Sequence, residues 1–234
     1  MAKLSDAVSV LARVSGRPEH EVAIHGRRAR EAGLIVQGGR GNSAPDVRVS
    51  DIVNLSLTFI GGEFAKDAKR TIKRYRALSA DKPFFRESNL KSLRLGAEGV
   101  VRRIAENDLP SSLQFFREPH SFGMALENLI FAAASGQLEQ QLNDLSDELE
   151  FRIEMYRPFL RAMIRLGDPF DMSGPVFAVS YLRSGANPGE IRNTFGTFRA
   201  EHDRETIVAI TGKTIFALGA LLADEEAAPG RQGP

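Results

Sequence analysis

Residues 4–37, LSDAVSVLARVSGRPEHEVAIHGRRAREAGLIVQ, and 38–49, GGRGNSAPDVRV, decide how the N-terminal part of this chain folds. Apolar residues recur at helical spacing from Val8 onward, and the pair Ser15-Gly16 ends this first pattern. A second pattern starts at Pro18 and stops at Gly33, and its expected apolar face is formed by Val22, Ile24 and Ala29. We therefore expect helices over 4–14 and 18–32, followed by β-like runs at 34–36 and 47–49 around a Gly-rich loop.

The second expected helix ends in Arg28-Ala29-Arg30-Glu31-Ala32-Gly33-Leu34-Ile35. This segment resembles the R-x-x-E-A-G-L-[IV] pattern at the end of the recognition helix in many bacterial winged helix-turn-helix domains. The resemblance covers about 50 residues, less than a quarter of the chain. It implies a supporting helix over 4–14, a recognition helix over 18–32 for the DNA major groove, and a wing over 37–46.

The cations and histidines of this segment are the predicted DNA contacts. Arginine can read guanine bidentately in the major groove, and a cation near a helix end can contact phosphate. Arg40 stands among the loop glycines, where it could enter the minor groove. A second basic pattern, over 63–78, places Phe64, Ala68, Ile72 and Tyr75 on one side of a helix and cations on the other. The predicted DNA-binding residues are His20, His25, Arg27, Arg28, Arg30, Arg40, Arg48, Lys69, Arg70 and Lys73.

Charge is distributed unevenly along the chain. Residues 1–84 hold 15 Lys/Arg and 9 Asp/Glu, a net charge of +6, whereas residues 85–234 hold 16 and 21, a net charge of −5. A basic N-terminal part favours a polyanionic partner such as double-stranded DNA.

The C-terminal part has a different pattern. We expect a helix over 121–138 with Ser121 as its cap, strands within 151–156, 162–166, 175–182 and 205–210, and a helix over 214–224. The predicted fold class is α+β. Its expected parts are a winged helix-turn-helix (1–60), a basic connecting helix (61–84), an oligomerisation or sensing domain with a small, mostly antiparallel sheet (85–228), and a disordered tail (229–234).

Several classes of function find no support in the sequence. The chain has no Cys, so it has no disulfides or thiolate sites. Its four His are scattered, and Gly212-Lys213-Thr214 lacks the leading Gly of a phosphate loop, because Ile207 occupies that position. We expect no enzyme, cofactor or metal site. No secretory signal or membrane-spanning run is visible, so we expect a cytoplasmic protein without a membrane partner.

Three functions fit these patterns. The first is a bacterial or prophage transcriptional regulator, a homodimer that self-associates through the apolar helix 51–60 or the sheet domain; its small-molecule effector is unknown. The second is a small terminase subunit, which packages DNA and forms a ring. The third is a non-enzymatic module that binds protein through its N-terminal fold.

Overall fold

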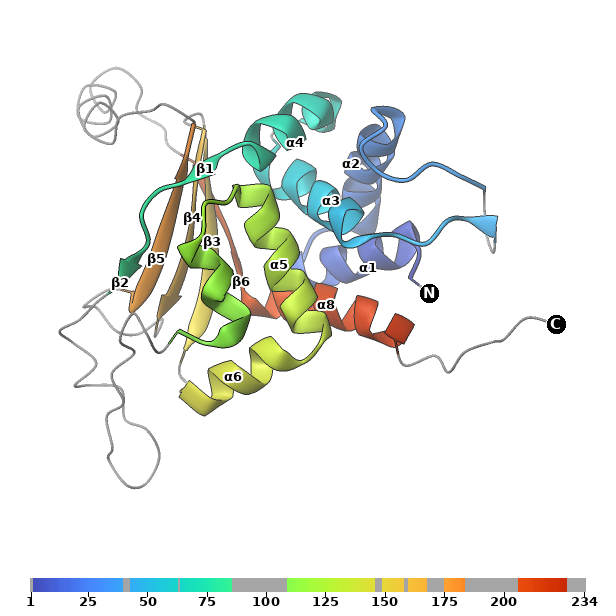
Figure 1. Ribbon diagram of the computed structural model, residues 1–234. Coiled ribbons are helices and arrows are strands. Elements are labelled where there is room, and N and C mark those ends of the chain that lie inside the picture. Colours follow the sequence, from blue (N-terminus) through green and yellow to red (C-terminus); the bar gives the residue numbers. More distant parts are fainter. Residues whose placement is uncertain are drawn as a thin grey trace, which may run out of the picture.

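The computed structural model describes residues 2–39, 43–62, 64–85, 109–145, 149–157, 160–167, 175–183 and 206–226 (Figure 1). The N-terminal part forms α1 (Leu4–Ser15), α2 (Glu19–Glu31), α3 (Val49–Gly61), the 3-10 turn η2 (Ala65–Asp67) and α4 (Ala68–Arg76). Short strands β1 (Ser79–Ala80) and β2 (Phe84–Phe85), the 3-10 helix η5 (Ser111–Arg117), α5 (Phe122–Ala134) and α6 (Gln137–Leu145) follow. The C-terminal part forms β3 (Glu150–Arg157), β4 (Arg161–Gly167), β5 (Phe177–Leu182), β6 (Thr206–Thr211) and α8 (Gly212–Glu226).

The sheet follows from the alternation of apolar and polar residues along its strands. Phe151, Ile153 and Met155 of β3 are buried on the face that carries the helices. All pairings are antiparallel and give the order β1-β5-β4-β3-β6, with β2 also pairing β5. The four predicted strands of the C-terminal part are confirmed, as is a mixed α+β structure with an antiparallel sheet.

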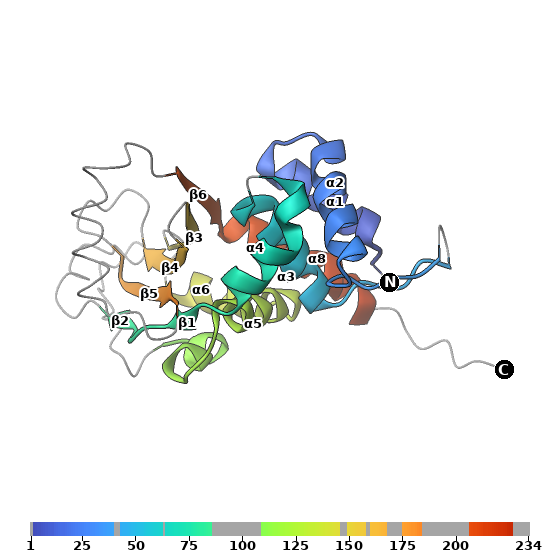
Figure 2. The ribbon, with the colours of Figure 1, turned by 90° about the horizontal axis from the view of Figure 1, so that it is seen from above.

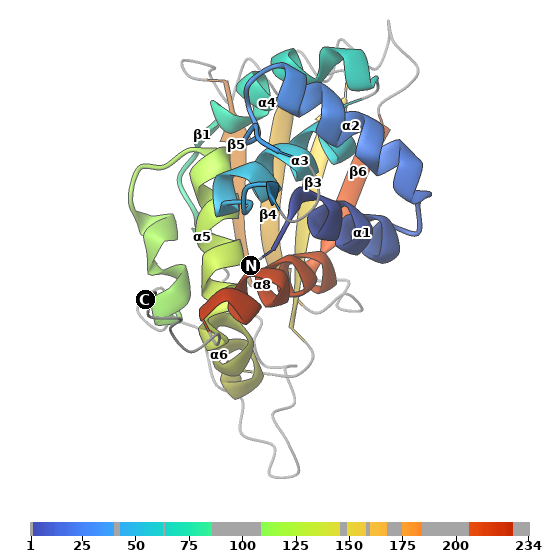
Figure 3. The ribbon, with the colours of Figure 1, turned by 90° about the vertical axis from the view of Figure 1, so that its right-hand side faces the viewer.

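The helices cover one face of this sheet, as Figures 1 and 3 show. Helix α3 lies at the centre of the helical layer, and every residue from Asp51 to Thr58 is buried. It contacts α1, α2, α4, α5 and β3. The prediction that helix 51–60 is a self-association surface is therefore wrong, because its apolar side chains are buried in the core of the same chain.

The N-terminal helices share a core with the rest of the chain. Helix α1 packs against α8, and Tyr75 on α4 donates a hydrogen bond of 2.9 Å to the backbone oxygen of Tyr156 on β3. A Cβ at Gly61 would collide with Cε of Met155, so α3 and β3 approach closely at this point. The buried residues form one hydrophobic cluster across both parts.

The predicted helices agree closely with the structure at several ends. Gly16 has a φ of 65°, and its backbone N–H bonds the end of α1. Ser121 caps α5, accepting a hydrogen bond of 3.3 Å from the backbone nitrogen of Met124. Strand β6 passes directly into α8 at Gly212, between the strand and the helix that were expected there. The expected tail, 229–234, lies outside the described residues.

No helix in the described part of the chain is long and apolar enough to cross a membrane.

Candidate nucleic-acid interface

Helix α2 is fixed on α1 and α3 by a narrow buried stripe. Val22, Gly26 and Ala29 are buried and recur at helical spacing. A Cβ at Gly26 would lie 3.2 Å from Cδ1 of Leu55, so α2 and α3 approach closely at this point. This packing fixes which side of α2 faces outward.

The outward side of α2 carries His20, Ile24 and Arg27, three exposed residues at helical spacing. Ile24 was expected on the apolar packing face, but it is 50% exposed. The sequence-based assignment of Ile24 is thus corrected, and Ile24 joins the candidate interface, where a branched alkyl group can contact a thymine methyl.

Two predicted arginines share one carboxylate at the end of α2. Nε of Arg27 lies 2.9 Å from Oε1 of Glu31, and Nη1 of Arg28 lies 2.8 Å from Oε2. Hydrogen bonds from Arg27 and Arg28 hold the pKa of Glu31 below its ordinary value. Because the side chains of Arg27 and Arg28 are 72% and 53% exposed, phosphates can compete with Glu31 for them. Arg30 is also exposed.

His25 turns away from this surface. Its Nδ1 lies 3.3 Å from Oγ1 of Thr58, and its ring meets the ring of Phe59 edge-on at 5.6 Å. Burial lowers the pKa of His25, and a hydrogen bond with the backbone of Thr58 and the charge of Glu21 only partly oppose this effect. We therefore remove His25 from the predicted DNA contacts, because its ring is engaged with α3.

The predicted wing does not form a strand pair in the described residues. Leu34–Val36 and Val47–Val49 were expected as short strands, but 34–39 and 43–48 are irregular. Their backbone donors bind elsewhere: Val36 N donates to Oδ1 of Asp51 (3.0 Å), and Val47 N donates to the oxygen of Ala2 (3.0 Å). The two arms still extend away from the helices in Figures 1 and 2.

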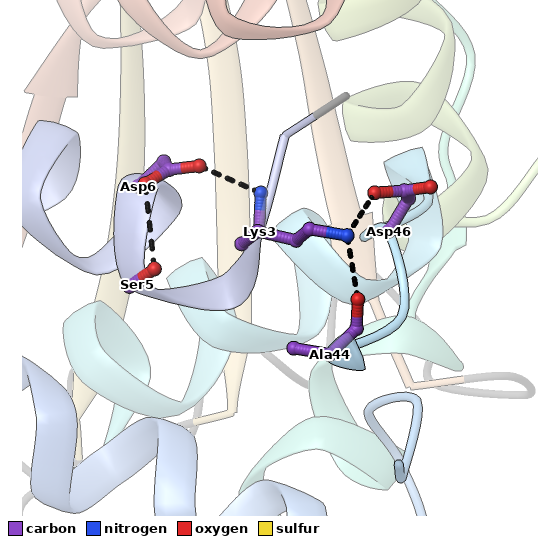
Figure 4. A network of polar contacts seen from close by, with 5 residues as sticks. All are labelled: Lys3, Ser5, Asp6, Ala44 and Asp46. Atoms are coloured by element: carbon purple, nitrogen blue, oxygen red, sulfur yellow. Dashed lines mark hydrogen bonds and ion pairs between the residues drawn. The ribbon is translucent and has the colours of Figure 1, made fainter. Parts of the chain in front are cut away.

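The N-terminal residues anchor the second arm of this loop (Figure 4). Nζ of Lys3 donates to Oδ1 of Asp46 (2.6 Å) and to the oxygen of Ala44 (2.5 Å). The backbone N–H of Lys3 donates to Oδ2 of Asp6, which also orients the start of α1. Arg40, at the expected wing tip, lies outside the described residues, while Arg48 is exposed just before α3.

Helix α4 adds a second basic surface. Ala68, Thr71, Ile72 and Tyr75 are buried against the protein. The exposed cations of η2 and α4 are Lys66, Lys69, Arg70, Lys73 and Arg74. Arg70 forms an ion pair with Asp67 at 3.2 Å.

Phe64 departs from the predicted basic helix. It precedes η2, is 53% exposed, and has Nζ of Lys66 5.2 Å from its ring centroid. It does not join the buried side of α4, because the chain enters the α-helix only at Ala68.

The two basic helices are neighbours. Helix α2 contacts both η2 and α4, and both helices pack on α3. Figure 3 shows α2 and α4 together at the top of the helical layer. We call the exposed cations of α2, η2 and α4 the basic face. Its members are Arg27, Arg28, Arg30, Lys66, Lys69, Arg70, Lys73 and Arg74.

A polar network connects this region to α5. The side-chain amide of Asn54 donates to the oxygen of Leu34, just after α2, and Nη1 of Arg76 donates to Oδ1 of Asn54 (2.8 Å). Arg76 also forms an ion pair with Glu127 on α5. These bonds tie the end of α2, α3, α4 and α5 together.

No family model, curated protein or solved structure matches this chain. Among the described residues, no group of His, Asp and Glu could hold a metal ion.

Proposed function

We propose that this chain is a sequence-specific DNA-binding protein, a bacterial or prophage transcriptional regulator that acts as a homodimer. Helix α2 would read the major groove, and loop 37–46 would contact the minor groove or the backbone. The observation that carries the proposal is that α2, which presents His20, Ile24 and Arg27 outward, contacts α4, whose exposed residues are all cations.

The two helices supply different parts of DNA recognition. On α2, His20 and Arg27 offer hydrogen-bonding groups and Ile24 offers an alkyl group, the chemistry that distinguishes base pairs in the major groove. The exposed lysines and arginines of α4 have long side chains that can approach phosphate oxygens from several directions, and such contacts carry no sequence information. A helix whose exposed side bears both polar and apolar groups, next to a helix whose exposed residues are all cations, supports double-stranded DNA as the partner.

Selection of bound sites from random DNA tests the specificity. We expect the wild type to enrich one site, and Arg27→Ala/Arg28→Ala to lose that enrichment. Lys213→Ala, which removes an exposed cation at the start of α8, is the control and should enrich the wild-type site. If no site is enriched, or if the double variant enriches the same site equally well, α2 is not a recognition helix.

The salt dependence of binding tests the phosphate contacts. Each neutralised phosphate contributes about 0.9 to the slope of log K against log salt. We expect Lys69→Ala/Lys73→Ala to reduce this slope by about 2 on any duplex sequence. If binding to DNA has no salt-dependent component, a protein partner is favoured instead. A molecular mass that corresponds to eight or more subunits would favour a ring-forming packaging protein.

A further inference from the structure

Strand β6 forms one border of the sheet. It pairs with β3 through Thr206 to Thr211, and in the part of the chain that the structure describes no strand pairs with its other side. Figure 3 shows β6 as the right-hand border of the sheet, behind the helices. Within the described residues, the outward-pointing backbone N–H and C=O groups of this border therefore have no partner strand and can pair with another strand.

The sequence of β6 lacks the usual protection of an edge strand. Thr206–Thr211 reads TIVAIT, without a charge or a proline, in a chain that is 26% charged. Charged residues, prolines and bulges are the common means by which proteins prevent pairing at a sheet edge. Ile207 is 49% exposed, whereas Tyr156, its partner on β3, is 6% exposed. Strand β6 is thus uncharged, rich in β-branched residues and, among the described strands, unpaired on its outer side.

We propose that β6 pairs with β6 of a second copy of this chain, so that one sheet continues across a two-fold axis. A two-fold axis perpendicular to a sheet makes two identical edge strands antiparallel, which is the pairing used throughout this sheet. Because β6 is uncharged, the two copies bring no like charges together. Because both copies use the same strand, the contact is complete with two chains and does not extend to a larger assembly.

This arrangement also suits the proposed function, on which its biological meaning rests. A rotation about an axis perpendicular to the sheet keeps both helical layers on the same side of the joined sheet. Helices α2 and α4 of both copies then lie on the same side of the joined sheet, an arrangement compatible with binding to one duplex. A ladder of six residues is about 20 Å long, so we expect a modest dimer with a Kd on the order of micromolar.

Sedimentation velocity without DNA tests the pairing. We expect the wild type to dimerise, and Ile207→Lys, which puts a charge on the edge strand, to raise the Kd at least about 100-fold. Phe131→Lys is the matched control, because Phe131 is a 63%-exposed apolar residue on α5, away from β6. This control should dimerise like the wild type.

Single-cysteine crosslinking provides an independent test that requires no disruptive change. The chain has no Cys, so one introduced at each position from Ile207 to Ile210 can form a disulfide only between copies. In an antiparallel pair with two-fold symmetry, one residue lies opposite the same residue of the second copy. We therefore expect oxidation to crosslink the two chains most efficiently when the cysteine is at that position. This scan remains decisive if Ile207→Lys fails to fold.

Three results would overturn the proposal. The first is a wild type that stays monomeric at protein concentrations up to 100-fold above the expected Kd. The second is a dimer that is lost in Phe131→Lys but kept in Ile207→Lys. The third is a cysteine scan in which no position of β6 forms a crosslink. Each can occur with DNA binding intact. Conversely, a β6-linked dimer that binds no DNA would leave the pairing standing and reject the proposed function.

Discussion

At the scale of single residues, Glu31 controls how much positive charge α2 presents. Its carboxylate accepts hydrogen bonds from both Arg27 and Arg28. We expect Glu31→Gln to strengthen DNA binding and to steepen the salt slope by about 1, because a charge that competes with phosphate is removed. Fluorescence anisotropy over a salt series measures both quantities. Glu139→Gln makes the same charge change on α6 and should have no effect; equal effects of the two variants would contradict a local role of Glu31.

His25 gives the folded protein a predictable pH dependence. Burial lowers the pKa of His25 in the folded state, so around pH 6.5 the unfolded chain binds more protons at this residue than the folded chain does. Protonation therefore favours unfolding, and the stability contributed by neutral His25 is lost as the pH falls below 6.5. We expect the free energy of unfolding to fall less between pH 7.5 and 5.5 in His25→Gln than in the wild type. Urea titrations at each pH measure the free energy of unfolding, and an equal fall in His25→Gln and in the wild type would contradict this role of His25.

At the scale of elements, the close approach of α5 and α8 depends on Gly219. A Cβ at this position would lie 2.6 Å from Cβ of Ala133 and 2.8 Å from the backbone nitrogen of Ala134. Alanine gains about 1 kcal/mol over glycine in helix propensity, but overpacking against backbone costs about 1–3 kcal/mol. We expect Gly219→Ala to lower the free energy of unfolding, measured by urea denaturation. The exposed neighbour provides the control, since Ala220→Ser should change stability by no more than about 0.5 kcal/mol.

The elements also show where sequence patterns suffice. Strands β3, β4 and β5 were predictable because their apolar residues alternate with a period of two along the face that carries the helices. Ile24 was misplaced because the buried stripe on α2 runs through Gly26, and a glycine carries no hydrophobic signal. The prediction of two short strands in the wing was wrong for another reason. Short apolar runs predict strand locally, but the donors of Val36 and Val47 find partners on Asp51 and Ala2, which are distant in sequence.

At the scale of the whole molecule, the basic face depends on the C-terminal part of the chain. Helix α3, on which α2 and α4 pack, is covered by α5 and β3, and α1 packs on α8. Removing those elements would expose apolar residues of α3 such as Leu57, which is 0% exposed in the full chain. A fragment of residues 1–84 would keep the net charge of +6 but lose the packing that orients α2.

We therefore expect fragment 1–84 to lack a cooperative unfolding transition by circular dichroism and to bind duplexes of any sequence alike. Its remaining affinity should be steeply salt-dependent, because an unfolded basic chain still releases counterions from DNA. The full chain should unfold in one transition that is the same by circular dichroism and by hydrogen exchange of α1 and β3. A fragment that unfolds cooperatively and enriches the same DNA site as the full chain would show instead that the first 84 residues fold independently, and that the shared core is a contact between two separable domains.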